Sequence, residues 1–378
     1  LKDLEDLAGA PSGYGSVSAP PRIARKSAET VDELLQTGLI SIGKTTSSEY
    51  GLTATVEPVD QEPTRNPHNL AHSSGGSSGG AAAMVAAGVV PIAHGGDGGG
   101  SIRIPSAFCG LVGLKPSRGR LATMAATKRM AIKIAQYGVL TRTVRDTANF
   151  YAAVEAISPA KALPPIGKVE GPSNEKRRIG VFVDVPISND IHPEIRQATE
   201  ETAKRLEGMG HQVEWITPPA DQGLADDFLM YWAFNAGMLE LLVRLSPTAR
   251  VNKLEPWTRG LAAYARSNAR HIRGAIRRLK AFEETYQDLF NDIDVLLSPT
   301  TAGPAPKLGF ISPSIDFEVG MQRLTQLLPY TPVQNVAGAP GINIPVGQTE
   351  DGLPIGVQLA AAQGQERTLL DLAFALES

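Results

Sequence analysis

The chain has 378 residues, of which 42% are apolar and 6% aromatic, as in an ordinary globular protein. Its net charge of −3 at pH 7 gives no electrostatic basis for binding nucleic acid or an anionic membrane, and no apolar run approaches the roughly 20 residues of a membrane span. The single cysteine, Cys109, excludes an internal disulfide, favours a reducing compartment and is expected to be buried. We therefore expect a cytoplasmic protein with no nucleic-acid and no membrane partner.

Helix and strand signals alternate from the N-terminal side of the chain. Residues 30–38 predict a short helix that begins at an N-cap threonine, Thr30, and ends at Gly38, and residues 39–42 predict a strand after it. Residues 79–88 are rich in alanine and end on glycine, which predicts a second helix. Residues 89–93 predict a short buried strand.

The second half of the chain contains a strand–helix–strand unit at residues 178–185, 192–208 and 212–216, which predicts a sheet with parallel strands. The basic run at residues 266–280 predicts a solvent-exposed helix face. The length of the chain is compatible with one large α/β domain or with two smaller ones. The other predicted helices are 139–157, 228–245, 258–290 and 366–377, and the other predicted strands are 294–297, 341–346 and 355–360.

Two glycine-rich loops, at residues 75–79 and 95–101, flank the alanine-rich helix and the strand after it. The first loop lies at a helix N-terminus, where unpaired backbone N–H groups favour negative charge. In the second loop five of seven residues are glycine, so the backbone can approach a ligand closely and direct its N–H groups toward one point. Ser101, at the end of this loop, therefore has the setting of a nucleophile beside an oxyanion hole.

This stretch resembles the signature of the amidase signature hydrolases, which use a Ser–cis-Ser–Lys triad. The matching segments are GGSSGG, GGDGGGSIRIPS and FCGLVGLKPSRGR, with LKDLEDLAG and GKTTSSEYG upstream and DVLLSPTTAGPAP and NVAGAPGINIPVG downstream. By position, the resemblance implies Ser101 as the nucleophile, Ser77 as the cis-serine and Lys2 as the base. It also implies an α/β fold of one domain, in which helices cover both faces of a mixed central sheet.

The implied activity is hydrolysis of carboxylic amide (C–N) bonds in a small-molecule substrate through an acyl-enzyme, with no metal and no cofactor. Burial would keep Lys2 neutral near pH 7, so that it can act as a base while Ser77 relays the proton. Asp97 and Arg103 are expected to support the loop by hydrogen bonds to backbone and to each other. Ser78, beside the relay, is expected to support it in the same way. The oxyanion hole is assigned to a run of backbone N–H groups, those of Gly98, Gly99, Gly100 and Ser101.

Some positions depart from the commoner pattern of the family. Gly96 and Gly98 stand where many members carry threonine and another side chain, and Ile104 stands where amidotransferase A subunits usually have glutamine.

Two alternatives stay open, an amidotransferase A-type subunit that releases ammonia for a partner enzyme and a non-catalytic binding protein on the same fold. Pocket residues are expected within residues 228–290 and in chain before Leu1. The acyl and amine groups of the substrate stay undetermined.

The resemblance covers residues 1–378, divided into a signature core at 1–150, a variable βαβ and helical region at 175–290, and a sheet-completing part at 291–378. Lys2 lies one residue from the start of the chain. A catalytic base needs packed chain on both sides, so we expect Leu1 to be an internal point of a longer protein. The family also suggests a homodimer.

Other motif matches do not fit their surroundings. Residues 38–45 match the phosphate-loop pattern, but a helix precedes them and their middle residues are strand formers, so nucleotide binding through Lys44 is not expected. His68 and His72 stand four residues apart without a third ligand, so a zinc site is not expected. Residues 75–79 fit the G-x-S-x-G elbow, but that fold needs a late catalytic histidine, and the last one here is His271.

Overall fold

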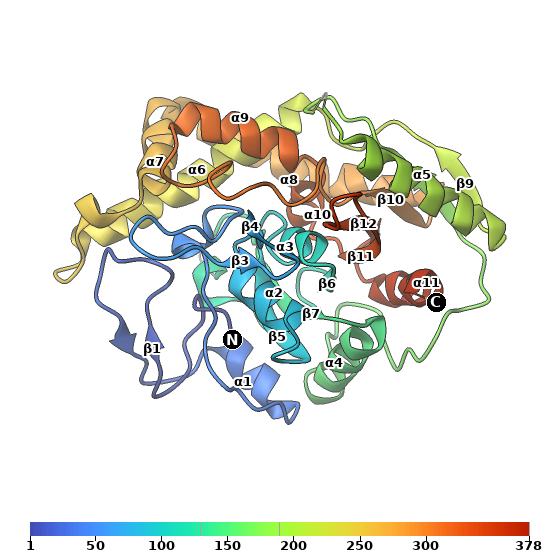
Figure 1. The fold of residues 1–378 in the computed structure, drawn as a ribbon, viewed down its shortest axis with the longest axis horizontal. Helices are drawn as coiled ribbons and strands as arrows, with labels where there is room; N and C mark the ends of the chain where they lie inside the picture. Colours follow the sequence, from blue (N-terminus) through green and yellow to red (C-terminus); the bar gives the residue numbers. More distant parts are fainter. Residues whose placement is uncertain (129, 189, 378) are drawn as a thin grey trace.

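A mixed β-sheet runs through the centre of the computed structural model, which describes residues 1–128, 130–188 and 190–377 (Figure 1). Its eight strands lie in the order β5-β7-β6-β11-β12-β10-β8-β9. Neighbours are antiparallel from β5 to β10 and parallel from β10 through β8 to β9. The bounds are β5 Ile92–Asp97, β6 Val112–Lys115, β7 Gln136–Thr141, β8 Arg178–Val181, β9 Gln212–Trp215, β10 Val295–Pro299, β11 Gly341–Gln348 and β12 Pro354–Ala361.

Helices cover both faces of this sheet (Figure 1). Side chains alternate between the faces of a strand, so Val295 and Leu297 of β10 pack with α4, α5 and α11, whereas Leu296 packs on the opposite face with Tyr286 of α8. The expected α/β fold with a mixed sheet is therefore confirmed. The bounds are α1 Glu29–Gln36, α2 Gly79–Ala86, α3 Arg103–Phe108, α4 Val144–Ile157, α5 Pro193–Gly208, α6 Gln222–Leu245, α7 Pro256–Ser267, α8 Ile272–Asp288, α9 Phe317–Leu327, α10 Pro332–Val336 and α11 Glu366–Glu377.

Short elements complete the chain. The small strands β1 Pro11–Ser12 and β2 Arg22–Ile23 pair with each other, as do β3 Arg65–Asn66 and β4 Asn69–Ser73. The strand–helix–strand unit of the second half is confirmed, because β8 and β9 are parallel and α5 lies between them in sequence. The division into parts at 1–150, 175–290 and 291–378 stays a prediction.

Two predictions near the start of the chain are wrong. Residues 39–42 form no strand, and the side chains of Ile40 and Ile42 are 87% and 72% exposed, so alternation of apolar residues there does not indicate a buried face. The cap residue of α1 is Ala28 rather than Thr30, and it makes no side-chain cap hydrogen bond. Thr30 is buried inside the helix, where its hydroxyl donates to Glu5 instead.

The structure also corrects some element boundaries. Strand β5 begins at Ile92 and continues through Asp97, so the first three residues of the second glycine-rich loop belong to a strand. Residues 136–141 form strand β7, which the predicted helix at 139–157 overlapped, and strand β6 at 112–115 was not predicted. The helix predicted at 258–290 is two helices, α7 and α8, with a short 3₁₀ segment Ala269–His271 between them.

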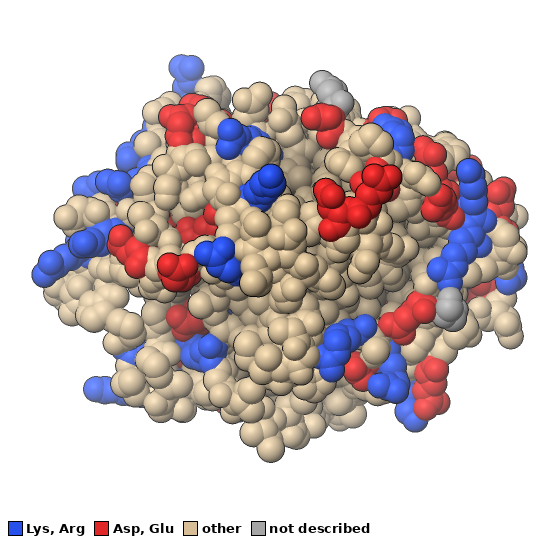
Figure 2. Space-filling view, viewed as in Figure 1, with Lys and Arg blue, Asp and Glu red and all other residues tan. Residues whose placement is uncertain are grey.

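Within the described residues, one helix, α6, is by length and composition apolar enough to span a bilayer. The sequence analysis predicted only residues 228–245 of this helix and no run of that length. One side of α6 packs against α7 and buries Ala233 and Ala236 in a cluster with Leu261. On the face of the molecule in Figure 2, Lys and Arg side chains are interspersed with Asp and Glu, without one extended patch of a single sign.

Candidate active site

The loop between β5 and α3 is folded around the carboxylate of Asp97. One carboxylate oxygen accepts the backbone N–H of Gly100 at 2.7 Å, and the other accepts that of Ile102 at 3.2 Å and that of Arg103 at 3.4 Å. Asp97 ends β5 and is fully buried. The strand therefore delivers an acceptor to the centre of the loop that carries Ser101.

Arg103, the first residue of α3, fastens this loop to the C-terminal part of the chain. Its guanidinium donates to both carboxylate oxygens of Asp97 at 3.0 Å. It also donates to Gln334 at 2.9 Å, to Asn335 at 2.6 Å and to Gln358 at 2.7 Å. Burial alone would raise the pKa of Asp97, but the charge and hydrogen bonds of Arg103 hold it below its ordinary value. The pair is a buried, fully hydrogen-bonded ion pair.

Gly100 can only be glycine in this arrangement. Its φ is +127°, and a Cβ there would come within 2.3 Å of the hydroxyl oxygen of Thr331. That hydroxyl donates to the carbonyl of Gly99 at 2.7 Å. The N–H of Gly100 is used by Asp97, whereas the N–H groups of Gly98, Gly99 and Ser101 have no acceptor among the described residues. Of these three, Gly99 and Ser101 belong to residues that line a cavity.

Lys2 is buried, with 1% of its surface exposed, and its ammonium group contacts the first glycine-rich loop. Its Nζ donates to Ser77 Oγ at 2.7 Å and to the carbonyl of Gly96 at 3.0 Å. Burial lowers the pKa of Lys2 to about 7, although Asp97 and Glu5 act in the opposite direction. The Gly76–Ser77 peptide is cis. The structure thus brings together two residues that lie 75 positions apart in the sequence.

Backbone contacts hold the segment around Lys2 in place. The N–H of Asp3 donates to the carbonyl of Thr45 at 3.1 Å, and the N–H of Thr45 donates to the carbonyl of Leu1 at 2.7 Å. The N–H of Lys2 donates to Nδ1 of His94 at 3.3 Å. Together these bonds tie the segment to β5 and to residue 45 of a separate loop, which gives the lysine a fixed backbone.

Ser78 joins the two glycine-rich loops. Its hydroxyl donates to the carbonyl of Gly96 at 3.3 Å and accepts the N–H of the same residue at 3.3 Å. The carbonyl of Gly96 therefore receives both Ser78 and Lys2. A Cβ on Gly96 would lie 2.8 Å from Met124 Cε, so the methionine occupies the space that a larger residue would need at this departure from the family pattern.

Two buried residues beside Lys2 were missed by the sequence analysis. The Glu5 carboxylate accepts the hydroxyl of Thr30 at 2.8 Å, and burial raises its pKa to about 7. His94 is buried and stacks on Tyr137, and burial lowers its pKa to about 3. Nothing in the local sequence marks either residue as buried.

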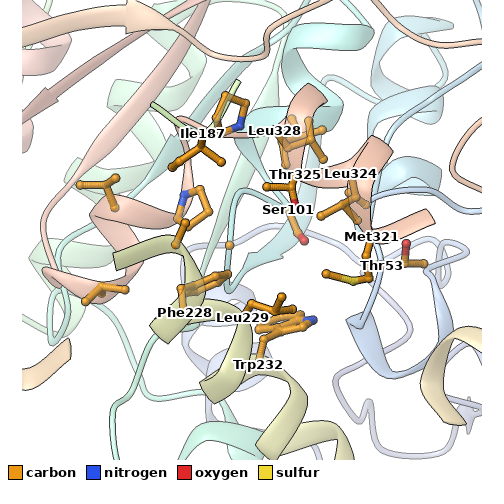
Figure 3. Close-up of a pocket in the computed structure, with 18 of the residues that line it drawn as sticks. Thr53, Ser101, Ile187, Phe228, Leu229, Trp232, Met321, Leu324, Thr325 and Leu328 are labelled. Atoms are coloured by element: carbon orange, nitrogen blue, oxygen red, sulfur yellow. The ribbon is translucent and has the colours of Figure 1, made fainter. Parts of the chain in front are cut away.

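Ser101 lines a cavity of about 120 Å³ and is 8% exposed. In Figure 3 its hydroxyl lies among the side chains of Phe228, Trp232, Met321 and Leu324, which come from α6 and α9. Residues 51–54 form another part of the wall. The arrangement therefore presents a serine hydroxyl, free loop N–H groups and a desolvated amine near one apolar cavity.

Comparison with known proteins agrees with this geometry. The family model described as Amidase matches residues 1–370. The chain belongs to the amidase signature family. It is 43% identical over 384 residues to the Mycobacterium tuberculosis protein named "Putative amidase AmiC", covering 100% of this chain and 80% of that one.

Solved amidases have the same fold. The structure of 6-aminohexanoate cyclic dimer hydrolase complexed with substrate superposes with a TM-score of 0.86 and 28% identity, covering 100% of this chain and 83% of that one. A bacterial aryl acylamidase of the amidase signature family superposes with a TM-score of 0.81 and 25% identity, covering 100% and 81%. This amidase is therefore an amide-hydrolysing enzyme.

The other motifs of the amidase sequence have structural roles. Lys44 forms an ion pair with Asp3 and donates to the carbonyl of Pro11 and to the Ser12 hydroxyl, so it serves no phosphate loop. His68 contacts the carbonyl of Cys109, which is buried as expected. In the described ranges no three His, Cys, Asp or Glu side chains are grouped as metal ligands would be.

Proposed function

We propose that this amidase hydrolyses a small-molecule carboxylic amide through an acyl-enzyme on Ser101, with Lys2 as base and Ser77 as proton relay. The observation that carries the proposal is the contact of 2.7 Å between Lys2 Nζ and Ser77 Oγ, made by a lysine whose pKa is lowered to about 7. A lysine that is neutral near pH 7 can accept a proton, as general-base catalysis requires.

In the first half of the proposed reaction, Ser101 Oγ attacks the amide carbon while its proton passes through Ser77 to Lys2. The carbonyl oxygen becomes an oxyanion, which the free N–H groups of Gly98, Gly99 and Ser101 would stabilise. The C–N bond then breaks, and the leaving amine takes the proton that returns from Lys2. The sequence analysis included Gly100 in the oxyanion hole. Its N–H group donates to Asp97 instead, so we propose that Gly100 supports the shape of the loop.

In the second half, water attacks the acyl-enzyme and the same groups transfer protons in the reverse sense. The water gives one proton through Ser77 to Lys2, the ester bond to Ser101 breaks, and the serine oxygen recovers its proton. The carboxylic acid leaves. Ser78, Asp97 and Arg103 act through the position of the two loops, since they bond to backbone groups, to one another and to polar side chains of the C-terminal part. The charge of Asp97 also raises the pKa of Lys2.

The cavity favours this hydrolase over an amidotransferase A-type subunit. Free glutamine, an ammonia donor, carries an ammonium and a carboxylate, and burying either without a partner is costly. No charged side chain lines the cavity in the part of the chain that the structure describes.

The resemblance also supports the proposal of a cytoplasmic homodimer, and sedimentation equilibrium of the purified chain measures its oligomeric state.

The proposal is tested by intact-mass analysis after treatment with a fluorophosphonate probe. We expect a single adduct that maps to Ser101, disappears in Ser101→Ala and forms much more slowly in Lys2→Ala. The exposed Ser173 provides a matched control, and Ser173→Ala should label like the wild type. Amide hydrolysis by Ser101→Ala should fall at least about 10³-fold. A folded protein that gives no adduct would leave the non-catalytic binding protein as the better interpretation.

A further inference from the structure

The wall of the cavity next to Ser101 is almost entirely apolar. Among the residues that the structure describes, Thr53 and Thr325 are, besides Ser101, the only side chains on it with a hydroxyl, amide or charged group. Its large side chains come from three helices, namely Phe228, Leu229 and Trp232 of α6, Trp257 of α7, and Met321 and Leu324 of α9.

The polar atoms of the two tryptophans are already hydrogen-bonded within the protein. Trp232 Nε1 donates to the carbonyl of Leu52 at 3.1 Å, and Trp257 Nε1 donates to the same carbonyl at 2.9 Å. Both indole N–H groups are therefore used to fix the wall segment at residues 51–54. What the tryptophans leave for a ligand is carbon surface.

The aromatic rings also press against the glycine-rich loop. A Cβ on Gly99 would lie 3.0 Å from Phe228 Cζ, and one on Gly98 would lie 3.2 Å from Trp232 Cζ3. The two rings are stacked with their centroids 5.9 Å apart. Here the structure accounts for the departure from the family pattern at Gly98, because Trp232 occupies the space of the side chain that other members carry there.

Such a wall discriminates by charge. An ammonium or carboxylate moved from water into this space would lose its hydration and find no oppositely charged partner among the described side chains of the wall. An uncharged hydrocarbon group would instead gain about fourfold in binding for each methylene removed from water. The acyl group is the part of the substrate that stays bonded to Ser101 after the amine has left, so the space beside Ser101 suits the acyl side.

We propose that this cavity binds the acyl group of an uncharged amide whose acyl chain is aliphatic or aromatic, and that it rejects acyl chains carrying a charge. The assignment to the acyl side rests on the proposed acyl-enzyme at Ser101. The selectivity for uncharged groups rests on the wall alone.

The test compares three 4-nitroanilides with the same six-carbon acyl chain, ending in methyl (hexanoyl), ammonium (6-aminohexanoyl) or carboxylate (adipoyl). We expect kcat/KM for each charged substrate to be about 100-fold below that for hexanoyl. A ratio below tenfold for either charged substrate overturns the proposal.

A variant pair on α9 sharpens the result. Thr325 is half-buried on the wall, so Thr325→Glu places a carboxylate beside the acyl chain and Thr325→Gln is its uncharged control. We expect Thr325→Glu to raise kcat/KM for 6-aminohexanoyl relative to hexanoyl at least tenfold over Thr325→Gln. Equal ratios in the two variants count against the assignment of this cavity to the acyl chain.

Binding to the Ser101→Ala protein separates this proposal from the proposed chemistry. Calorimetric titration with hexananilide, 6-aminohexananilide and adipic acid monoanilide needs no turnover. If hexananilide binds at least tenfold tighter than both charged anilides but the wild type hydrolyses no amide, the proposed function fails and the selectivity stands. If the wild type hydrolyses all three nitroanilides alike and the anilides bind alike, the proposed function survives and this inference fails.

Discussion

Ser101 stands between two unlike surroundings. On one side lie Lys2, Ser77, Asp97 and Arg103, a network of buried polar groups in which nearly every donor has an acceptor within 3.4 Å. On the other side lies the cavity, where the described side chains are apolar apart from two threonines and Ser101 itself. On the polar side, directional bonds fix the backbone of the loop that carries Ser101, and on the other side packed side chains shape the space beside it.

The difference separates chemistry from selectivity. The polar side is built mostly from residues 1–103, where the two glycine-rich loops lie close in sequence. Its groups share hydrogen-bond partners, so we expect that moving one of them displaces the others. The cavity is built from α6, α7 and α9, whose side chains need only fill space. Substitutions on the polar side should therefore reduce turnover of all substrates, and substitutions in the cavity should change the choice among them.

The largest effect is expected at Lys2, on the polar side. Lys2→Met removes the base and should lower kcat/KM by about 10³-fold for every amide, while the exposed Lys168→Met serves as control. Because only the neutral amine accepts a proton and the pKa of Lys2 is about 7, wild-type kcat/KM should rise with pH through about 7 and then level off. A profile that is flat between about pH 5 and pH 9 contradicts the role of Lys2.

Arg103 tests whether the polar side is fixed by its ion pair. Arg103→Lys keeps a charge but cannot reproduce the fork that reaches Asp97, Gln334 and Gln358. We expect the free energy of unfolding, measured with urea, to fall by about 3 kcal/mol. Arg145→Lys, at an exposed ion pair, should change it by no more than about 0.5 kcal/mol. Equal effects in the two variants would mean that the buried pair does not hold the loop.

The sequence was informative for site residues that lie close to one another in the chain. Ser77, Ser101 and Asp97 lie in one signature. Asp97 bonds to the loop that carries Ser101, and Ser78, next to Ser77, bonds to Gly96 of the strand that ends at Asp97. Lys2 was reached only through the resemblance, since nothing in its own surroundings predicts a partner 75 residues away. The missed strand β7 contains a central glycine and follows a loop, so its residues carried no clear alternation.

The cavity was the part that sequence reasoning could not complete. Its expected source, residues 228–290, does supply Phe228, Trp232 and Trp257. Met321 and residues 51–54 were not anticipated, because tertiary packing brings them to the wall from distant parts of the chain. Periodicity reports that such side chains are apolar, but it does not report which cavity they face.

A smaller and substrate-dependent effect is expected at Gly98, where the two sides of Ser101 meet. Gly98→Ala places a Cβ 3.2 Å from Trp232 Cζ3, so this ring, which lines the cavity, must shift by a few tenths of an ångström. We expect kcat/KM for the hexanoyl nitroanilide to fall about tenfold, and the acetyl analogue to be less affected. Adding Trp232→Phe should recover part of the loss, whereas Gly171→Ala, whose Cβ meets open space, should match the wild type. Equal losses for both substrates would place the damage on the polar side instead.

The smallest expected effect is a shift of the pH profile in Glu5→Gln. The negative charge of Glu5 favours the ammonium form of Lys2, so its removal should lower the pKa of Lys2 and move the rising limb of kcat/KM to lower pH, by less than about one pH unit. The shift is limited because burial raises the pKa of Glu5 to about 7, which leaves the carboxyl only partly ionised where Lys2 titrates. Glu29→Gln, at an exposed ion pair, should leave the limb in place. Because glutamine can still accept the Thr30 hydroxyl, a movement to higher pH would show that the charge of Glu5 does not act on the base.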